Sequence, residues 1–328
     1  MTSTTPVGQS AEARDGSPIP SRRPKCALLD QGNSPPWALE AIARGGGQLV
    51  AIEEAEALLL WHHPPNPSDV LDALEDAPGI RWVQLPSAGV DRYAAVLAAA
   101  PDVVFTCAKG VYAEPVAEHA LALTLAGLRE LQVRARTNDW GEETGLTLYD
   151  AHVTCIGGGG IAQEFLRLLE PFRVRSTVVR RHPTPMEGVD RVMPPDQIHS
   201  ALASADVVLI AVALTADTDG LIASSELRVM GKHAWLINIA RGRIINQDDL
   251  VVALQEGWIG GAALDATTPE PLPPDHVLWT LDNCLITPHV AVGYELGLPL
   301  LGARFQENVA HFAADEGMVG LVDLDHGY

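Results

Sequence analysis

Four consecutive glycines follow a strand-like run in the segment VTCIGGGGIA, residues 153–162. Such a run cannot pack a hydrophobic core, so it must serve the backbone. The spacing Gly157-x-Gly159-x-x-Ala162, after a strand and before a helical stretch, is typical of a dinucleotide-binding turn. The helix that follows would direct free N–H groups and its positive dipole end at the pyrophosphate. The predicted cofactor contacts in this turn are Gly157, Gly159, Gly160 and Ile161.

The type of dinucleotide depends on the residue that ends the next predicted strand, RSTVVRR, residues 175–181. An acidic residue there would bind the ribose 2′-hydroxyl of NAD. This chain has Arg180 instead, with Arg181 beside it. Two guanidiniums can bind a 2′-phosphate through paired hydrogen bonds, although two solvated arginines at a strand end are the alternative. We therefore expect NADP or NAD as the cofactor, with a preference for NADP.

Polar side chains also follow three later apolar runs, at the points where predicted strands end. The three segments are WLINIARGRIINQDDL (235–250), AALDATTPEPLP (262–273) and CLITPHV (284–290). In a doubly wound sheet the carboxyl ends of the strands line the ligand crevice. Taken singly, each residue has a plainer alternative: a surface arginine, a turn carboxylate or a histidine bonded to backbone. Taken together after a dinucleotide turn, four residues are expected to gather near the cofactor: Arg241, Asp265, Glu270 and His289.

The elements that must position these residues alternate between short apolar runs and helix-like stretches from residue 24 onward. This alternation predicts an α/β fold with parallel sheets covered by helices on both faces. The first predicted strands are CALLD (26–30), QLVAI (48–52), ALLLW (57–61), IRWVQL (80–85) and DVVFTC (102–107). A single long helix is predicted over residues 114–137, as a bridge to a second alternating series that ends near residue 290.

A chain of 328 residues is long for one core and predicts about two domains. We expect a disordered tail over residues 1–23, a substrate domain over 24–115 with 300–328, and a dinucleotide-binding domain over 116–299. The last helical segment would cross back onto the first domain. Each domain is expected to be a doubly wound parallel sheet, with the ligand cleft between the two.

The overall composition excludes several classes of partner. The formal net charge of −20 argues against nucleic acid and anionic membrane surfaces. There is no apolar run long enough for a transmembrane helix, and the polar tail lacks the apolar core of an export signal. The cysteines are expected to be buried thiols of a cytoplasmic protein: Cys26, Cys107, Cys155 and Cys284. No metal site is expected, since His62 and His63 are adjacent in an extended segment and point apart.

From about residue 24 to residue 315, the chain resembles the D-isomer-specific 2-hydroxyacid dehydrogenase family. The matching segments include AGVD (88–91), VAEHALAL (116–123), IGGGGIA (156–162), INIARGRIIN (237–246), ALDATTPEPLP (263–273) and ITPHV (286–290). The resemblance implies a flavodoxin-like substrate domain, a Rossmann cofactor domain and hydride transfer between NAD(P)(H) and a small 2-keto or 2-hydroxy acid.

The resemblance also implies a role for each residue of the predicted site. His289 would be the general acid and base that exchanges a proton with the substrate oxygen. Glu270 would orient the imidazole and raise its pKa. Arg241 would bind the substrate carboxylate and polarise the carbonyl, aided by the backbone N–H groups of Ala88 and Gly89.

Four further residues are expected on the cofactor side: Thr215, Thr218, Ala240 and Asp265. For Thr218, a plain helix cap is an equal alternative. Ala162 stands where the family has a third glycine, and Arg180 stands where it has an acid, so the usual preference for NAD does not carry over directly.

The expected substrate is glyoxylate, hydroxypyruvate or another small 2-ketoacid, read by side chains in the cleft. Candidates for that contact are Trp61, His62, His63 and Tyr112. Relatives that oxidise formate usually have glutamine at the position of Glu270, so a hydroxyacid fits better. Two alternatives stay open: a catalytically idle, dinucleotide-dependent dimeric binding module, and a phosphoglycerate dehydrogenase-type enzyme. The resemblance also implies a homodimer, paired through the bridging helix and the segment around Trp140.

Overall fold

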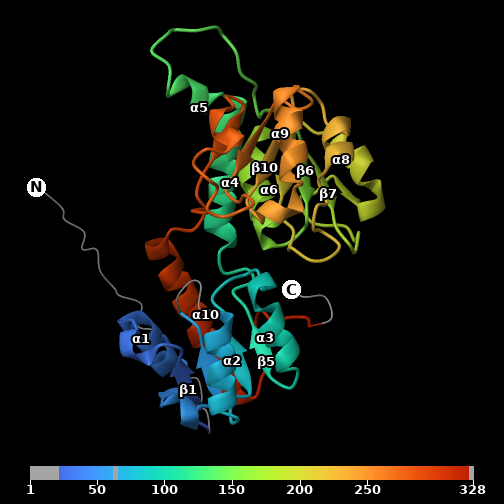
Figure 1. Cartoon of the computed structure of the whole chain (residues 1–328). Coiled ribbons are helices and arrows are strands. Elements are labelled where there is room, and N and C mark those ends of the chain that lie inside the picture. The colour runs from blue at the N-terminus through green and yellow to red at the C-terminus, as the bar shows by residue number, and fades with distance from the viewer. Residues whose placement is uncertain (1–21, 62–65, 325–328) are drawn as a thin grey trace, which may run out of the picture.

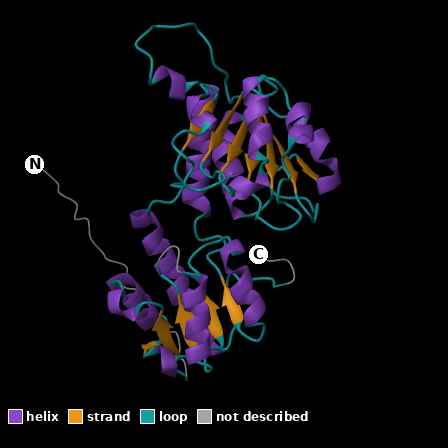
Figure 2. Ribbon diagram, in the orientation of Figure 1, coloured by secondary structure: helices purple, strands orange, loops and turns teal. Residues whose placement is uncertain are grey.

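The computed structural model describes residues 22–61 and 66–324, and it has two α/β lobes, one above the other in Figures 1 and 2. Of the tail predicted to be disordered, only Arg22 and Arg23 are described. Arg22 Nη2 lies 2.5 Å from a carboxylate oxygen of Glu56, so this residue contacts the first lobe. His62 and His63 lie outside the described residues.

The first lobe is built on a five-stranded parallel sheet in the order β2-β1-β3-β4-β5, which is the flavodoxin-like order. Its strands are β1 (Lys25–Leu28), β2 (Gln48–Leu49), β3 (Ala57–Leu59), β4 (Trp82–Gln84) and β5 (Val104–Thr106). The central strands read as continuous apolar runs because helices cover both of their faces. Leu58 packs toward helices α2 (Pro67–Asp76) and α3 (Ala94–Ala99), whereas Leu59 packs toward α1 (Pro36–Arg44).

Helix α10 (Tyr294–Ala314) returns the chain from the second lobe to the first, as predicted. Phe305 and Val309 on this helix are fully buried against α1. Arg304, which is also buried, donates hydrogen bonds to the carbonyls of Cys107 and Lys109. Those two residues lie between β5 and α4 (Ala113–Leu128). Arg304 therefore bonds α10, which returns the chain to the first lobe, to the segment through which the chain leaves that lobe.

The second lobe has a seven-stranded parallel sheet in the order β12-β11-β10-β9-β6-β7-β8. Counted within the lobe this is 7-6-5-4-1-2-3, which is the Rossmann order with one added strand. The strands are β6 (His152–Ile156), β7 (Arg175–Val179), β8 (Arg191–Met193), β9 (Val207–Ile210), β10 (Trp235–Asn238), β11 (Gly261–Leu264) and β12 (Cys284–Ile286). The prediction of two doubly wound parallel-sheet domains is thus confirmed.

Helices cover both faces of this second sheet. Helices α4 and α6 (Gly160–Leu169) share one buried cluster with the sheet. The opposite face packs against α7 (Ile198–Leu202), α8 (Ser224–Val229) and α9 (Gln247–Gln255). The side chains that follow the strands therefore start from a sheet that is packed on both faces.

The single long helix predicted over residues 114–137 is wrong. Helix α4 ends at Leu128, Glu130 is left-handed with φ 54°, and a separate short helix α5 (Leu131–Arg134) follows. The break has a tertiary cause, because the carbonyl of Leu128 accepts a hydrogen bond from the N–H of Leu146. Residues 135–147, here called the arm, project beyond α5 away from both lobes (Figure 1).

The cysteines are free and buried, as predicted. Burial raises the pKa of Cys26, Cys155 and Cys284 to about 12, so these thiols behave as small apolar groups. In the ranges 22–61 and 66–324, no helix combines the length and apolar character that a membrane span requires.

Candidate active site

The carboxyl ends of five strands of the second sheet stand level with one another. Paired residues run across the sheet in register, and they are Ile156, Ile210, Asn238, Leu264 and Ile286. The residue that follows each strand therefore emerges at the same edge. Polar loops after β10, β11 and β12 and the glycine turn after β6 thus lie along the same edge of the sheet.

The glycine turn has the backbone geometry that a dinucleotide requires. Gly157 has φ 102°, and a Cβ there would overlap the carbonyl of Ala211. Gly159 is the N-cap of α6 and provides no side-chain cap, while a Cβ added to it would meet nothing within 4 Å. Open space above uncapped N–H groups fits a pyrophosphate. Ala162 is fully buried, as the packing role of the third position demands.

Gly160 and Ile161, the first two residues of α6, differ in exposure: Gly160 is exposed and Ile161 is partly buried. A Cβ at Gly160 would lie 3.4 Å from the Cβ of Ala113, which brings the start of α6 beside the start of α4. The side chain of Ile161 is partly buried and packs against the cluster under α4 and α6. Both residues therefore present backbone rather than side chain to the turn.

Arg180 and Arg181 follow β7 next to the glycine turn. The stem of Arg180 runs along Gly158, where a Cβ would lie 3.2 Å from Arg180 Cδ. Arg181 Nη2 lies 3.3 Å from Asp217 Oδ2. The carboxylate comes from the loop that contains Thr215 and Thr218, so this loop and the two arginines border the same part of the predicted cofactor site.

Within that loop, Thr218 is used locally. Its hydroxyl accepts a hydrogen bond from the N–H of Thr215 at 2.8 Å and donates one to the carbonyl of Ala213 at 2.7 Å. These bonds close a turn before α8, and they are not the helix cap that the sequence left open as an alternative. Ala240, nearly buried after β10, donates its N–H to Asn238 and offers its carbonyl to Arg241.

Arg241 reaches from the second lobe to the first. Its Nε donates to Asp91 Oδ1 at 3.1 Å and its Nη1 to the carbonyl of Ala240 at 2.8 Å. Its Nη2 lies so close to Gly89 that a Cβ there would overlap the guanidinium. The structure therefore brings Arg241 and the Ala88–Gly89 segment together, with Ala88 exposed beside them.

Asp91 was not predicted as a site residue, although it ends the AGVD segment. Its carboxylate closely follows the predicted substrate loop at Ala88 and Gly89, and this was the signal in the sequence that could have identified it. What sequence could not show is its partner, because Arg241 lies 150 positions away.

His289 and Glu270 form the pair that the sequence predicted. His289 Nδ1 lies 3.0 Å from Glu270 Oε2, which leaves Nε2 as the ring nitrogen for proton exchange. Glu270 Oε1 also accepts the N–H of Thr267. A Cβ at Gly242 would overlap the carbonyl of Thr267, so the loops that carry Arg241 and Glu270 touch through bare backbone.

The pair is electrostatically matched. The hydrogen bond that His289 donates to Glu270, together with the charge of Glu270, raises the pKa of His289 against the opposing effects of burial and of Arg241. Burial acts to raise the pKa of Glu270, but the hydrogen bond and charge of His289 outweigh it and hold that pKa below its ordinary value. Together these two shifts favour a protonated His289 beside an ionised Glu270. The imidazolium of His289 is then the acid that can donate a proton.

Asp265 shapes the loop that carries His289. Its buried carboxylate accepts hydrogen bonds from the hydroxyl of Thr287 and from the N–H groups of Val290 and Ala291. Its backbone carbonyl accepts the N–H of His289, which has a left-handed φ of 52°. Burial acts to raise the pKa of Asp265, but the hydrogen bonds it accepts keep that pKa low.

Two further polar residues hold these loops and were missed by sequence reasoning. Gln247, the first residue of α9, accepts the N–H of Thr268 and donates to its carbonyl, so it clamps the loop before Glu270. His119 on α4 lies 3.1 Å from Thr287. Both stand inside segments quoted for the resemblance or the site, but neither has a spacing signal of its own.

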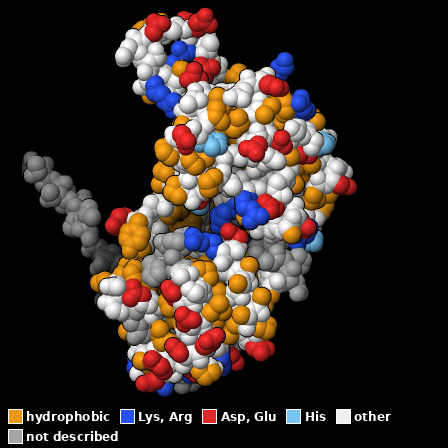
Figure 3. Space-filling view, in the orientation of Figure 1, with side chains coloured by type: hydrophobic (Ala, Val, Ile, Leu, Met, Phe, Trp, Pro, Cys, Tyr) orange, Lys and Arg blue, Asp and Glu red, His pale blue; other side chains and the backbone are white. Residues whose placement is uncertain are grey.

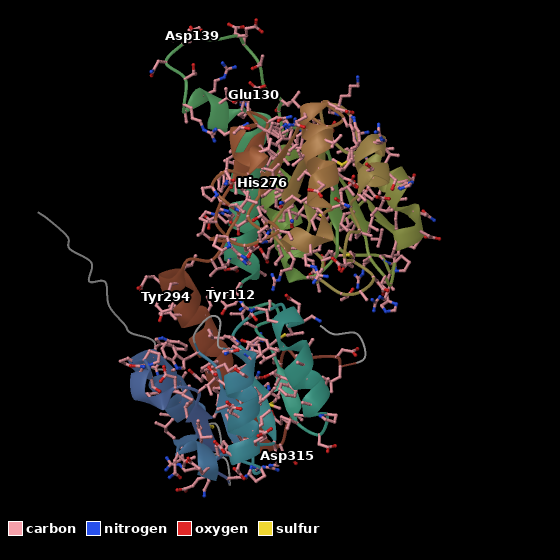
Figure 4. All side chains as sticks on the ribbon, in the orientation of Figure 1. Tyr112, Glu130, Asp139, His276, Tyr294 and Asp315 are labelled. Carbon is pink, nitrogen blue, oxygen red and sulfur yellow. The ribbon has the colours of Figure 1, made fainter. Side chains whose placement is uncertain are left out.

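Aromatic residues border the gap between the lobes. Tyr112 and Tyr294 lie there in Figure 4. The Tyr112 hydroxyl donates to the carbonyl of Pro86, and burial raises its pKa to about 12. Trp61 donates its indole N–H to the carbonyl of Leu29. Figure 3 shows Lys and Arg side chains gathered where the lobes meet, on a molecule whose net charge is −20.

Comparisons with known proteins identify the family of this chain. A model of the "D-isomer specific 2-hydroxyacid dehydrogenase, NAD binding domain" matches residues 119–291, and one of the catalytic domain of the same family matches residues 47–178. A Mus musculus protein named glyoxylate reductase/hydroxypyruvate reductase is 36% identical over 235 residues, which cover 68% of this chain and 72% of that protein. A Corynebacterium melassecola protein described as uncharacterized is 34% identical over 296 residues, covering 88% of this chain and 95% of the relative.

Solved structures give the same result. A D-isomer specific 2-hydroxyacid dehydrogenase from Xanthobacter autotrophicus Py2, in complex with NADPH and MES, superposes with a TM-score of 0.81 at 25% identity. The match covers 94% of this chain and 100% of that one. The chain therefore belongs to the D-isomer specific 2-hydroxyacid dehydrogenase family and is an NAD(P)-dependent oxidoreductase.

Proposed function

We propose that this oxidoreductase reduces a small 2-ketoacid of the glyoxylate or hydroxypyruvate type to the 2-hydroxy acid. The observation that carries the proposal is the convergence of His289, Glu270 and Arg241 at the edge of the second sheet that faces the first lobe. The name of the mouse relative supports a substrate of this size.

The proposed roles follow from the contacts. Arg241 would bind the substrate carboxylate, with the N–H groups of Ala88 and Gly89 beside it. His289 would donate the proton on Nε2 to the keto oxygen, and Glu270 would hold the Nδ1–H and stabilise the imidazolium before the transfer. A bound nicotinamide would supply the hydride.

We propose NADP(H) as the preferred cofactor. The residues that would hold the dinucleotide are Gly157, Gly159, Gly160, Ile161, Arg180, Arg181, Thr215, Thr218, Ala240 and Asp265. Arg180 and Arg181 are the basis of the preference, because guanidiniums bind a 2′-phosphate and a carboxylate at that position would repel it. Arg181 would have to share its charge between the phosphate and Asp217, which makes Arg180 the more important of the two.

A kinetic screen tests the proposal. Purified protein is mixed with NADPH or NADH and a panel of 2-ketoacids that includes glyoxylate, hydroxypyruvate and phosphohydroxypyruvate, and absorbance at 340 nm is followed. His289→Ala should lower kcat by roughly 100- to 10,000-fold while the Kd of the cofactor stays near the wild-type value. Cofactor binding without turnover of any ketoacid would favour an idle binding module, and turnover of phosphohydroxypyruvate alone would favour the phosphoglycerate dehydrogenase type.

We also propose that the protein is a cytoplasmic homodimer with a substrate domain at 24–115 and 300–328 and a dinucleotide-binding domain at 116–299. The arm and its flanks expose large apolar side chains that a second copy would cover: Leu131, Trp140, Leu146 and Tyr149. Trp140 is 95% exposed in the single chain. Free buried thiols fit a reducing compartment. Sedimentation equilibrium should give the mass of two chains, and a single-chain mass at micromolar concentration would contradict the dimer.

A further inference from the structure

A histidine that takes no part in the proposed chemistry lies beneath the loop that carries His289. His119 is on α4, the helix that packs along one face of the second sheet (Figure 1). Its Nε2 lies 3.1 Å from Thr287 Oγ1 and 3.4 Å from Asp265 Oδ1, and its side chain is 21% exposed. Thr287 directly follows β12 and precedes His289 by two residues.

A count of hydrogens fixes the direction of these bonds. The Thr287 hydroxyl has one proton, and the 2.6 Å contact assigns it to Asp265 Oδ1, since an ionised carboxylate can only accept. Thr287 Oγ1 must then accept from His119, so His119 Nε2 bears a hydrogen. The result is a directed chain in which the imidazole N–H donates to the hydroxyl and the hydroxyl donates to the carboxylate.

The carboxylate at the end of this chain holds the loop that carries His289. Asp265 accepts the N–H groups of Val290 at 2.9 Å and Ala291 at 3.1 Å, just after His289. Thr287, just before His289, is bound to the same carboxylate. The left-handed backbone at His289 is disfavoured for a residue with a side chain, so it persists only while its flanks are fixed.

We propose that His119 is a positioning residue for the reaction: by donating to Thr287, it fixes the Thr287–Asp265 pair and so holds the imidazole of His289 against Glu270. This inference rests on the proposed function, because it needs His289 as the acid. The charged groups that face His289 are Glu270, Arg241 and Asp265, and His119 acts on the last of these.

The test compares His119→Leu, which removes the donor, with His119→Gln, whose amide N–H can replace it. His119→Leu should lower kcat roughly 10- to 100-fold, with the Kd of NADPH within about threefold of the wild type. His119→Gln should restore most of the loss. The fall of the reduction rate with rising pH should begin at lower pH in His119→Leu, because an imidazole that moves away from Glu270 loses the interaction that raises its pKa.

A double-mutant cycle adds a test of the chain itself. Thr287→Val should cost about as much in kcat as His119→Leu, and the double variant should be little worse than either single one, because both break the same chain. The matched control is His233→Leu, which removes an imidazole whose Nε2 lies 2.7 Å from Asp206 in the second lobe, away from the predicted site residues. This control should keep the wild-type kcat and pH profile.

Hydrogen exchange at the amides of Val290 and Ala291 measures the support of the loop without depending on turnover. In His119→Leu these amides should exchange roughly tenfold faster than in the wild type, with little change in the His233→Leu control. If the wild type turns over no ketoacid, the proposed function fails, and unchanged exchange at these amides would separately overturn the positioning role. A lowered melting temperature with wild-type kcat and pH profile, or a glutamine variant no better than leucine, would likewise overturn it.

Discussion

Asp91→Ala would test whether catalysis depends on the ion pair that joins the lobes. Asp91 accepts from Arg241 Nε at 3.1 Å, and the two side chains are only 23% and 28% exposed. The variant would leave Arg241 bound to the carbonyl of Ala240 but free to turn away from Gly89, where we propose that the substrate carboxylate binds.

The size of the effect follows from the type of bond. A hydrogen bond between charged groups contributes about 1.5–3 kcal/mol when it is largely shielded from water. If Arg241 reaches the substrate only when Asp91 holds it, kcat/KM should fall roughly 10- to 150-fold, since each 1.36 kcal/mol is a factor of ten. Asp91→Asn keeps an acceptor oxygen but loses the charge, so its loss should be about half as large in free energy.

The assay is steady-state reduction of the best ketoacid at saturating NADPH, with the Kd of NADPH measured separately by fluorescence. The loss should appear mainly in the KM of the ketoacid. Asp150→Ala is the control, because it removes a carboxylate from the exposed pair with Arg173, where little effect is expected. Wild-type kcat/KM in Asp91→Ala, or a loss confined to the affinity for NADPH, would refute the reasoning.

Three other changes have definite expected outcomes. Reduction needs protonated His289, and Glu270 raises that pKa, so the rate should fall as pH rises through it; Glu270→Gln should move this fall to lower pH in a pH–rate profile, and an unmoved profile would contradict the pairing. Arg180→Asp should raise the Kd of NADPH more than that of NADH, and an unchanged ratio would count against the cofactor preference. Phe305→Ala leaves a cavity at a fully buried site between α10 and the first lobe, so it should lower the free energy of unfolding by about 3–5 kcal/mol. Urea denaturation measures this loss, and a loss below about 1 kcal/mol would argue against tight packing of α10 on that lobe.

Much of the fold was already determined by the local sequence. Alternating apolar runs and helix-like stretches predict parallel sheets, because a strand buried on both faces needs a continuous apolar run. The turn could be assigned because Gly157 has a positive φ that favours glycine, and because Gly159 leaves open space where a pyrophosphate would approach the backbone. The residues after β10, β11 and β12 could be grouped because parallel strands end at one edge, which makes Arg241, Glu270 and His289 neighbours.

Tertiary structure alone decided which side chains hold these residues in place. The partner of Arg241 is Asp91, 150 positions away, and the support of His289 includes His119, whose contact Thr287 is 168 positions away. The helix predicted to continue through residue 137 stops at Leu128 because the N–H of Leu146 takes its carbonyl. Local periodicity reports which face of an element is buried, but it has no information about which distant donor or acceptor lies opposite, and those partners are set only when the two lobes and their loops have packed.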